Sequence, residues 1–95
     1  MKEIDRLVHE PSRLLLLALL SRIKEADFVF LQRETALSKG NLSGHLSRLE
    51  EAGYVEIEKT FRAKIPLTLV RLTPDGHAAF ERYRKAMAGL LKPGP

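Results

Sequence analysis

The chain has 95 residues, enough for one small domain and too few for two. It contains no cysteine, which excludes disulfides, thiolate metal sites and a cysteine nucleophile. Its longest apolar run, Leu14–Leu20, is seven residues long, whereas a membrane helix needs about 20. Acidic residues near the start and the lack of a cleavage motif speak against a signal peptide, so we expect a cytoplasmic protein.

The positive charge is concentrated in the second half of the chain. There are 16 basic and 12 acidic residues, for a net charge of +4, and residues 1–37 are neutral overall. The segment Lys59–Arg71 contains four basic residues and no acidic one. Clustered bases in a basic chain indicate a partner that is a polyanion, such as DNA, although small basic proteins of other kinds are common.

The first third of the chain predicts mainly helix. Apolar residues at 4, 7 and 8 suggest a short helix that closes before Pro11. Pro11 suits the first turn of a longer helix, which we expect to run to about Ile23. That helix is apolar almost all round, so it is either a plain core helix or a central helix that also meets a partner subunit.

A second helical segment follows. Asp27–Phe30 is interpreted as a short extended stretch or a helix cap, and Leu31–Ala36 as a short helix. Ser38 is a good N-cap for a third helix, which Gly53 ends. Three apolar residues of that helix repeat on one face: Leu42, Leu46 and Leu49.

The remaining sequence predicts a hairpin and a last helix. Val55–Glu58 alternates as a half-buried strand does, and 67–72 is a second run of β type. Between them, 60–66 is expected to form an exposed basic loop. Thr73 and Pro74 then begin a helix whose apolar residues have heptad-like spacing, namely Phe80, Tyr83, Met87 and Leu90.

This order of elements predicts a winged helix-turn-helix, a mainly α fold with a small β-hairpin. We expect one DNA-binding domain over residues 1–92, with terminal helices that dimerise, and a tail over 93–95. The segments Leu37–Leu46 and Leu49–Val55 resemble the recognition helix and first wing strand of small prokaryotic transcriptional regulators of the MarR and ArsR type. Residues 72–76 resemble the leucine-threonine-x-x-glycine that joins wing and last helix in that family.

The resemblance implies a homodimer that binds double-stranded DNA through the third helix and the wing. At the wing the sequence departs from the family pattern, because Ile65 and Leu67 flank Pro66. We therefore expect Arg62 and Lys64 to contact phosphates without entering the minor groove deeply. The full predicted set of DNA-binding residues is Ser38, Lys39, Gly40, Asn41, Ser43, Gly44, His45, Ser47, Arg48, Arg62 and Lys64.

Several of these residues have a structural alternative. Asn41 can bind adenine, and its structural alternative is local capping of the helix. Lys39 can reach guanine, and its alternative is a solvated charge near the helix start. Gly44 in mid-helix would allow the backbone to approach DNA closely, or is a neutral surface glycine. His45 lies at the flank of the apolar stripe, where a half-buried structural histidine is also expected.

The predicted dimer interface combines residues of the first and last helices: Leu7, Leu15, Leu19, Phe80, Tyr83, Met87 and Leu90. No metal site or cofactor is predicted, no catalytic constellation points to an enzyme, and no residue marks a site for a small-molecule effector. The competing hypothesis is a winged helix that serves as a protein-interaction module without DNA, for which Glu56 and Glu58 on the wing strand are mild arguments.

Overall fold

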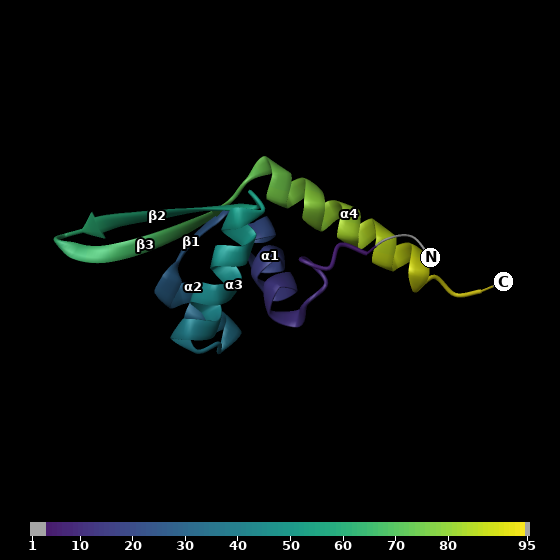
Figure 1. Cartoon of the computed structure of the whole chain (residues 1–95), viewed down its shortest axis with the longest axis horizontal. Helices are drawn as coiled ribbons and strands as arrows, with labels where there is room; N and C mark the ends of the chain where they lie inside the picture. Colours follow the sequence, from purple (N-terminus) through teal and green to yellow (C-terminus); the bar gives the residue numbers. More distant parts are fainter. Residues whose placement is uncertain (1–3, 95) are drawn as a thin grey trace.

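A computed structural model describes residues 4–94 of the chain. The elements follow in the order α1 (Pro11–Ile23), β1 (Glu25–Asp27), α2 (Phe28–Thr35), α3 (Lys39–Glu51), β2 (Val55–Arg62), β3 (Ile65–Leu72) and α4 (Pro74–Leu90). The molecule is elongated, 59 × 25 × 21 Å, because the β2–β3 hairpin and α4 extend in opposite directions from the other helices (Figure 1). Residues 1–3 of the predicted domain and Pro95 of the predicted tail lie outside the described residues.

The predicted starts of the three long helices are confirmed, and each start has a side-chain cap. The Glu10 carboxylate accepts a hydrogen bond from the Arg13 backbone N–H at 2.7 Å at the start of α1. The Ser38 hydroxyl accepts from Asn41 N–H at 3.1 Å in α3, and the Thr73 hydroxyl accepts from Gly76 N–H at 2.9 Å in α4. These contacts satisfy N–H groups that have no partner within the helix.

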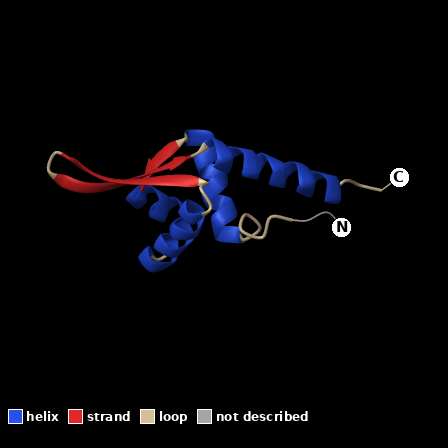
Figure 2. Cartoon of the chain, turned by 45° about the horizontal axis from the view of Figure 1, so that its top comes forward, coloured by secondary structure: helices blue, strands red, loops and turns tan. Residues whose placement is uncertain are grey.

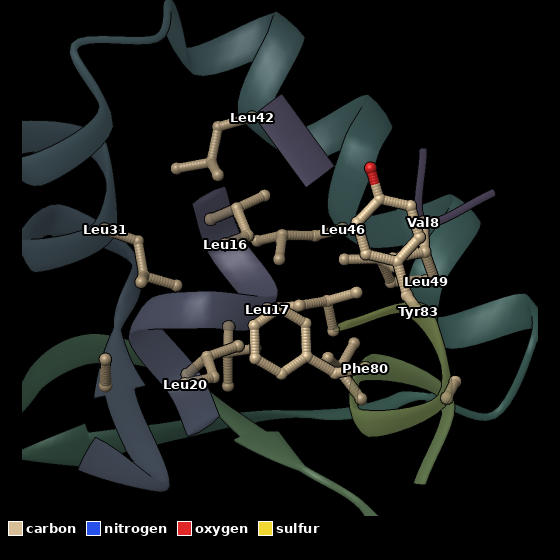
Figure 3. Close-up of a cluster of buried hydrophobic side chains, with 14 residues drawn as sticks. Val8, Leu16, Leu17, Leu20, Leu31, Leu42, Leu46, Leu49, Phe80 and Tyr83 are labelled. Atoms are coloured by element: carbon tan, nitrogen blue, oxygen red, sulfur yellow. The ribbon is translucent and has the colours of Figure 1, made fainter. Parts of the chain in front are cut away.

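The core lies where α1 crosses the other three helices and the sheet. Figure 3 shows the α1 side chains Leu16, Leu17 and Leu20 at the centre of this cluster. Around them are buried side chains of every other element: Ala26, Leu31, Leu42, Leu46, Leu49, Val55, Val70, Phe80 and Tyr83. The apolar stripe predicted for the third helix is therefore its buried face.

The sheet has three antiparallel strands in the order β1-β3-β2. The predicted basic loop over 60–66 is wrong, since β2 continues to Arg62 and β3 starts at Ile65. Only Ala63 and Lys64 form the turn, with φ angles of 50° and 68°. A two-residue turn with positive φ at both positions matches the twist of paired strands, so the hairpin tolerates unfavourable φ angles at two residues that are not glycine.

One prediction for the N-terminal half is corrected, and of the two alternatives for Asp27–Phe30 the helix cap is confirmed. Residues 4–8 contain a turn at 6–8 and no helix, because the Asp5 carboxylate accepts hydrogen bonds from Leu7 N–H and Val8 N–H. Phe28–Phe30 is helical, since the Asp27 carboxylate caps α2 at Phe30 N–H, 2.8 Å away. The extended stretch lies earlier, at β1, and pairs with β3.

Two further findings concern membranes and metals. Among residues 4–94, no helix is long and apolar enough to cross a bilayer. Within the same residues, no three His, Cys, Asp or Glu side chains are grouped so that they could hold a metal ion.

Candidate nucleic-acid interface

The exposed surface of the N-terminal ten residues of α3 is made of small, polar and basic residues. Since successive helical residues are about 100° apart, the buried Leu42, Leu46 and Leu49 leave the opposite side of the helix free. That free side and its flanks carry seven of the predicted residues, all exposed: Lys39, Gly40, Asn41, Ser43, Gly44, Ser47 and Arg48. The N-terminal ten residues of α3 contain no acidic residue, so this surface suits an anionic partner.

Figure 2 shows the β2–β3 hairpin, the wing, as two red strands that extend away from the helices. A groove lies between α3 and this wing. Lys39, Ser43 and Ser47 line it from α3, and Lys59 lines it from β2. The start of α2 closes the inner end of the groove, where Gln32 also contributes. The fold thus places one flank of α3 beside the wing.

Lys59 and Gln32 are among the groove residues that are absent from the predicted set. The signal for Lys59 is the basic segment that it begins, but the predicted strand ended one residue before it. Gln32 has no sequence signal, because its position beside α3 depends on how α2 packs. Lys59 adds a hydrogen-bonding group on the wing side of the groove, and Gln32 adds one at its inner end.

Asn41 and Arg48 lie on the flank of α3 away from the wing. The Asn41 backbone N–H bonds the Ser38 hydroxyl, and within residues 4–94 its carboxamide has no hydrogen-bond partner. The cap of α3 is therefore Ser38, and the Asn41 side chain is left available for a ligand. Ser38 is the N-cap of α3, and this structural role explains why a serine is found at this position.

Gly40 and Gly44 leave the middle of the exposed face open. A Cβ atom added at either glycine would meet no atom within 4 Å. Packing inside the protein therefore does not require glycine at position 44. A glycine in mid-helix costs about 1 kcal/mol relative to alanine, so a close approach by an external partner is a physical reason for its presence.

His45 is turned towards α1 and away from the exposed face. Its Nδ1 lies 3.1 Å from Arg13 Nη1 and 4.0 Å from Glu10 Oε1. Arg13 is itself fixed by a hydrogen bond from its Nε to the Leu7 carbonyl oxygen at 2.6 Å. The half-buried structural alternative thus describes His45, and we remove it from the set of candidate DNA contacts.

The acidic residues of β2 lie on the other face of the sheet. Val55 and Ile57 face the core, so Glu56 and Glu58 face outwards. Arg71 donates hydrogen bonds to Glu58 and to Glu25, and these bonds raise the pKa of its guanidinium. Glu58 is thus paired with a cation within the sheet, on the side opposite to the groove.

Three acidic residues do lie near the groove or the end of α3. Asp27 lines the inner end of the groove and is occupied as the cap of α2. Glu50 and Glu51 are at the C-terminal end of α3, where they would repel phosphates. An anionic partner is therefore expected to meet the N-terminal half of α3 and the outer part of the wing.

The geometry of helix, groove and basic wing agrees with the comparison to family models. The model described as winged helix DNA-binding domain matches residues 12–91. The chain belongs to this family. The resemblance noted in the sequence and the predicted fold are thereby confirmed.

Individual relatives agree with the winged helix DNA-binding domain family. An uncharacterized protein of Methanocaldococcus jannaschii is 37% identical over 71 residues, which are 75% of this chain and 77% of that protein. A transcriptional regulator homologue from Pyrococcus horikoshii OT3 has a TM-score of 0.87 and 28% identity, covering 92% of this chain and 86% of that one. The DNA-bound structure of overoxidized AbfR has a TM-score of 0.75 and 28% identity, covering 86% of this chain and 59% of that one.

Proposed function

We propose that this winged helix protein is a transcriptional regulator that binds double-stranded DNA sequence-specifically as a homodimer. In this proposal the N-terminal half of α3 enters the major groove and the wing contacts the adjacent backbone. The observation that carries it is the exposed, acid-free surface of the first ten residues of α3 beside a wing with cations at its tip. The regulator described from Pyrococcus horikoshii and the DNA-bound AbfR structure support it.

The roles of the residues follow from their chemistry and position. Asn41 and Lys39 are the candidate base readers, since a carboxamide can bind adenine and an ammonium can bind guanine in the major groove. Gly44 and the serines on the same side, Ser43 and Ser47, let the helix approach closely. Arg48 is proposed to bind a phosphate, because it is exposed on the flank of α3.

The wing supplies the remaining phosphate contacts. Arg62 and Lys64 are exposed at the tip of the hairpin, and Lys59 lies along the groove. Phosphate contacts position the protein without reading sequence. We therefore propose that α3 reads the base sequence and that the wing fixes the position of the protein along the duplex.

The homodimer is proposed from apolar surface that one subunit leaves uncovered. Leu15 and Leu90 keep 42% and 48% of their surface exposed, and α4 extends beyond the core (Figure 1). By contrast, Phe80 and Tyr83 are 8% exposed and pack in the core of a single chain. The proposed seam therefore rests on the other predicted residues, with Leu15 and Leu90 the most exposed among them.

Selection from a pool of random duplexes tests the function directly. The chain is mixed with the pool, bound duplexes are recovered and sequenced, and the enrichment is compared with that of Asn41→Ala. We expect a motif of two inverted half-sites whose centres are about 34–36 Å apart along the duplex, as for a two-fold dimer. Recovery of a random pool would contradict sequence specificity, and failure to retain any duplex would favour the protein-interaction module.

A further inference from the structure

The tip of the wing carries two bulky apolar side chains in open solvent. Phe61 is 71% exposed and Ile65 is 67% exposed. A large apolar side chain held in solvent at a basic hairpin tip is a candidate contact with a partner. Because residues 59–74 contain basic residues but no acidic one, charge complementarity favours a partner that is anionic and also offers apolar surface.

The strand register places these two side chains on opposite faces of the hairpin. Phe61 pairs with Pro66, and Ile65 pairs with Arg62. Since side chains alternate along a strand, Phe61 shares a face with Lys59 and Ile57, both of which line the groove beside α3. Phe61 therefore lies on the side of the wing that faces DNA in the proposed function, and Ile65 lies on the other side.

The length of β2 gives Phe61 a suitable reach. Val55 is buried where β2 meets α3, and Phe61 lies six residues further along the strand, which is about 20 Å at about 3.3 Å per residue. One turn of duplex is about 34–36 Å, so a major groove and the next minor groove are about 17 Å apart along the axis. With α3 in the major groove, a strand of this length can reach the adjacent minor groove.

From this arrangement we infer that Phe61 is an apolar wedge that enters the minor groove and partly unstacks one base step, so that the DNA bends. The inference rests on the proposed function and assigns a new role to a residue outside the predicted set. It keeps Arg62 and Lys64 on phosphates but replaces the expectation that the wing does not enter the minor groove deeply. Lys64 lies in the turn and Arg62 lies on the face of Ile65, so both long basic side chains are at the tip beside the wedge, where they can reach phosphates. Apolar side chains between base steps kink a duplex, and pyrimidine–purine steps such as TA yield most easily.

The test compares Phe61→Ser with the matched control Ile65→Ser, because both remove an exposed apolar side chain from the same hairpin tip. The probe is a duplex of about 30 base pairs rich in TA steps, with a dye at each end and a 2-aminopurine at one step. Energy transfer between the dyes reports bending, 2-aminopurine fluorescence reports unstacking, and anisotropy reports affinity. Circular dichroism melting checks that both variants remain folded, as their exposure predicts.

We expect wild type and Ile65→Ser to bend the duplex and raise 2-aminopurine fluorescence. Phe61→Ser should lose both signals and bind about tenfold more weakly, while the salt dependence of binding stays the same. Phe61→Leu should recover part of the bend, since leucine is also an apolar wedge. This pattern would separate the wedge from the phosphate contacts of Arg62 and Lys64.

The contrary outcomes are distinct. Phe61→Ser that binds and bends DNA like wild type would overturn the wedge and leave the proposed function intact. Equal losses in both serine variants would overturn the face assignment. Absence of any wild-type binding to duplexes would contradict the proposed function itself, and the inference with it. A Phe61-dependent binding to phosphatidylserine vesicles with unchanged DNA binding would overturn the wedge in favour of a lipid contact.

Discussion

The backbone of Gly76 lies directly against the carbonyl oxygen of Tyr54. A Cβ atom on Gly76 would stand 2.1 Å from that oxygen, far inside van der Waals contact. The same carbonyl accepts a hydrogen bond from Thr73 N–H at 3.1 Å, and the Thr73 hydroxyl donates to the Gly53 carbonyl at 2.6 Å. The start of α4 is thus fastened to the turn between α3 and the wing, so this contact sets how the wing sits relative to α3.

Gly76→Ala should lower the free energy of unfolding by about 2 kcal/mol, because the methyl group must displace backbone atoms. Urea unfolding followed by circular dichroism measures the change. Gly44→Ala is the matched control, since a Cβ there meets no atom within 4 Å. The control should be as stable as wild type, or up to about 1 kcal/mol more stable from helix propensity. Equal stability of the two variants would contradict the steric role of Gly76.

Asn41→Ala should weaken binding to the selected motif by about 1–3 kcal/mol and leave binding to random duplex nearly unchanged. The reason is that a bidentate contact to a base discriminates between sequences, whereas the Ser38 cap of α3 uses only the Asn41 backbone. Anisotropy titrations on both duplexes measure the difference. Equal losses on the two duplexes would show that Asn41 contacts a phosphate.

Arg62→Ala combined with Lys64→Ala should reduce the salt dependence of DNA binding. Each phosphate neutralised contributes about −0.9 to the slope of log affinity against log salt, so four charges removed from a dimer should lower its magnitude by about 3 to 4. The control is the double variant Arg84→Ala and Lys85→Ala, which removes two exposed cations from α4. The control should keep the wild-type slope. An unchanged slope in the wing variant would show that the wing does not contact DNA phosphates.

Leu90→Asp should convert the proposed dimer to a monomer of unchanged fold. Leu90 is 48% exposed, so the substitution leaves the core intact, whereas a charge in a seam between subunits is strongly unfavourable. Light scattering after gel filtration measures the mass. Val29→Asp, an exposed apolar residue on α2, serves as the control and should remain a dimer. A wild-type mass of one subunit would refute the dimer outright.

Stability should fall at high pH through Tyr54. Burial, and then the negative charge of Asp5, raise the pKa of the Tyr54 phenol, whose hydroxyl donates to Asp5 Oδ2 at 3.2 Å. The folded state holds this proton more tightly than the unfolded state, so the stabilisation is present below about pH 10 and is lost as pH rises through the folded pKa. Urea unfolding at pH 8 to about pH 11 should show a steeper decline for wild type than for Tyr54→Phe. Parallel declines would contradict this linkage.

The sequence by itself determined the long helices and the exposed face of α3. Helix starts at Pro11, Ser38 and Thr73 depend on contacts between residues three or four apart, which the local sequence contains. The leucine period of α3 fixes its buried side and, by elimination, the side that holds Lys39 and Asn41. Such short-range rules carry over unchanged into the folded molecule.

Tertiary structure alone decided the details of the wing and of the partners. The turn at Ala63 and Lys64 lacks the usual glycine or asparagine signal, and strand pairing imposes it on the chain. The strand β1 forms because its three residues pair with the edge of β3, which is more than 40 positions away in sequence. The helical period placed His45 only at the flank of α3, and its contact with Arg13, which is distant in sequence, decided between its two roles. Each outcome depends on a neighbour that only the completed fold supplies, so no local pattern could specify it.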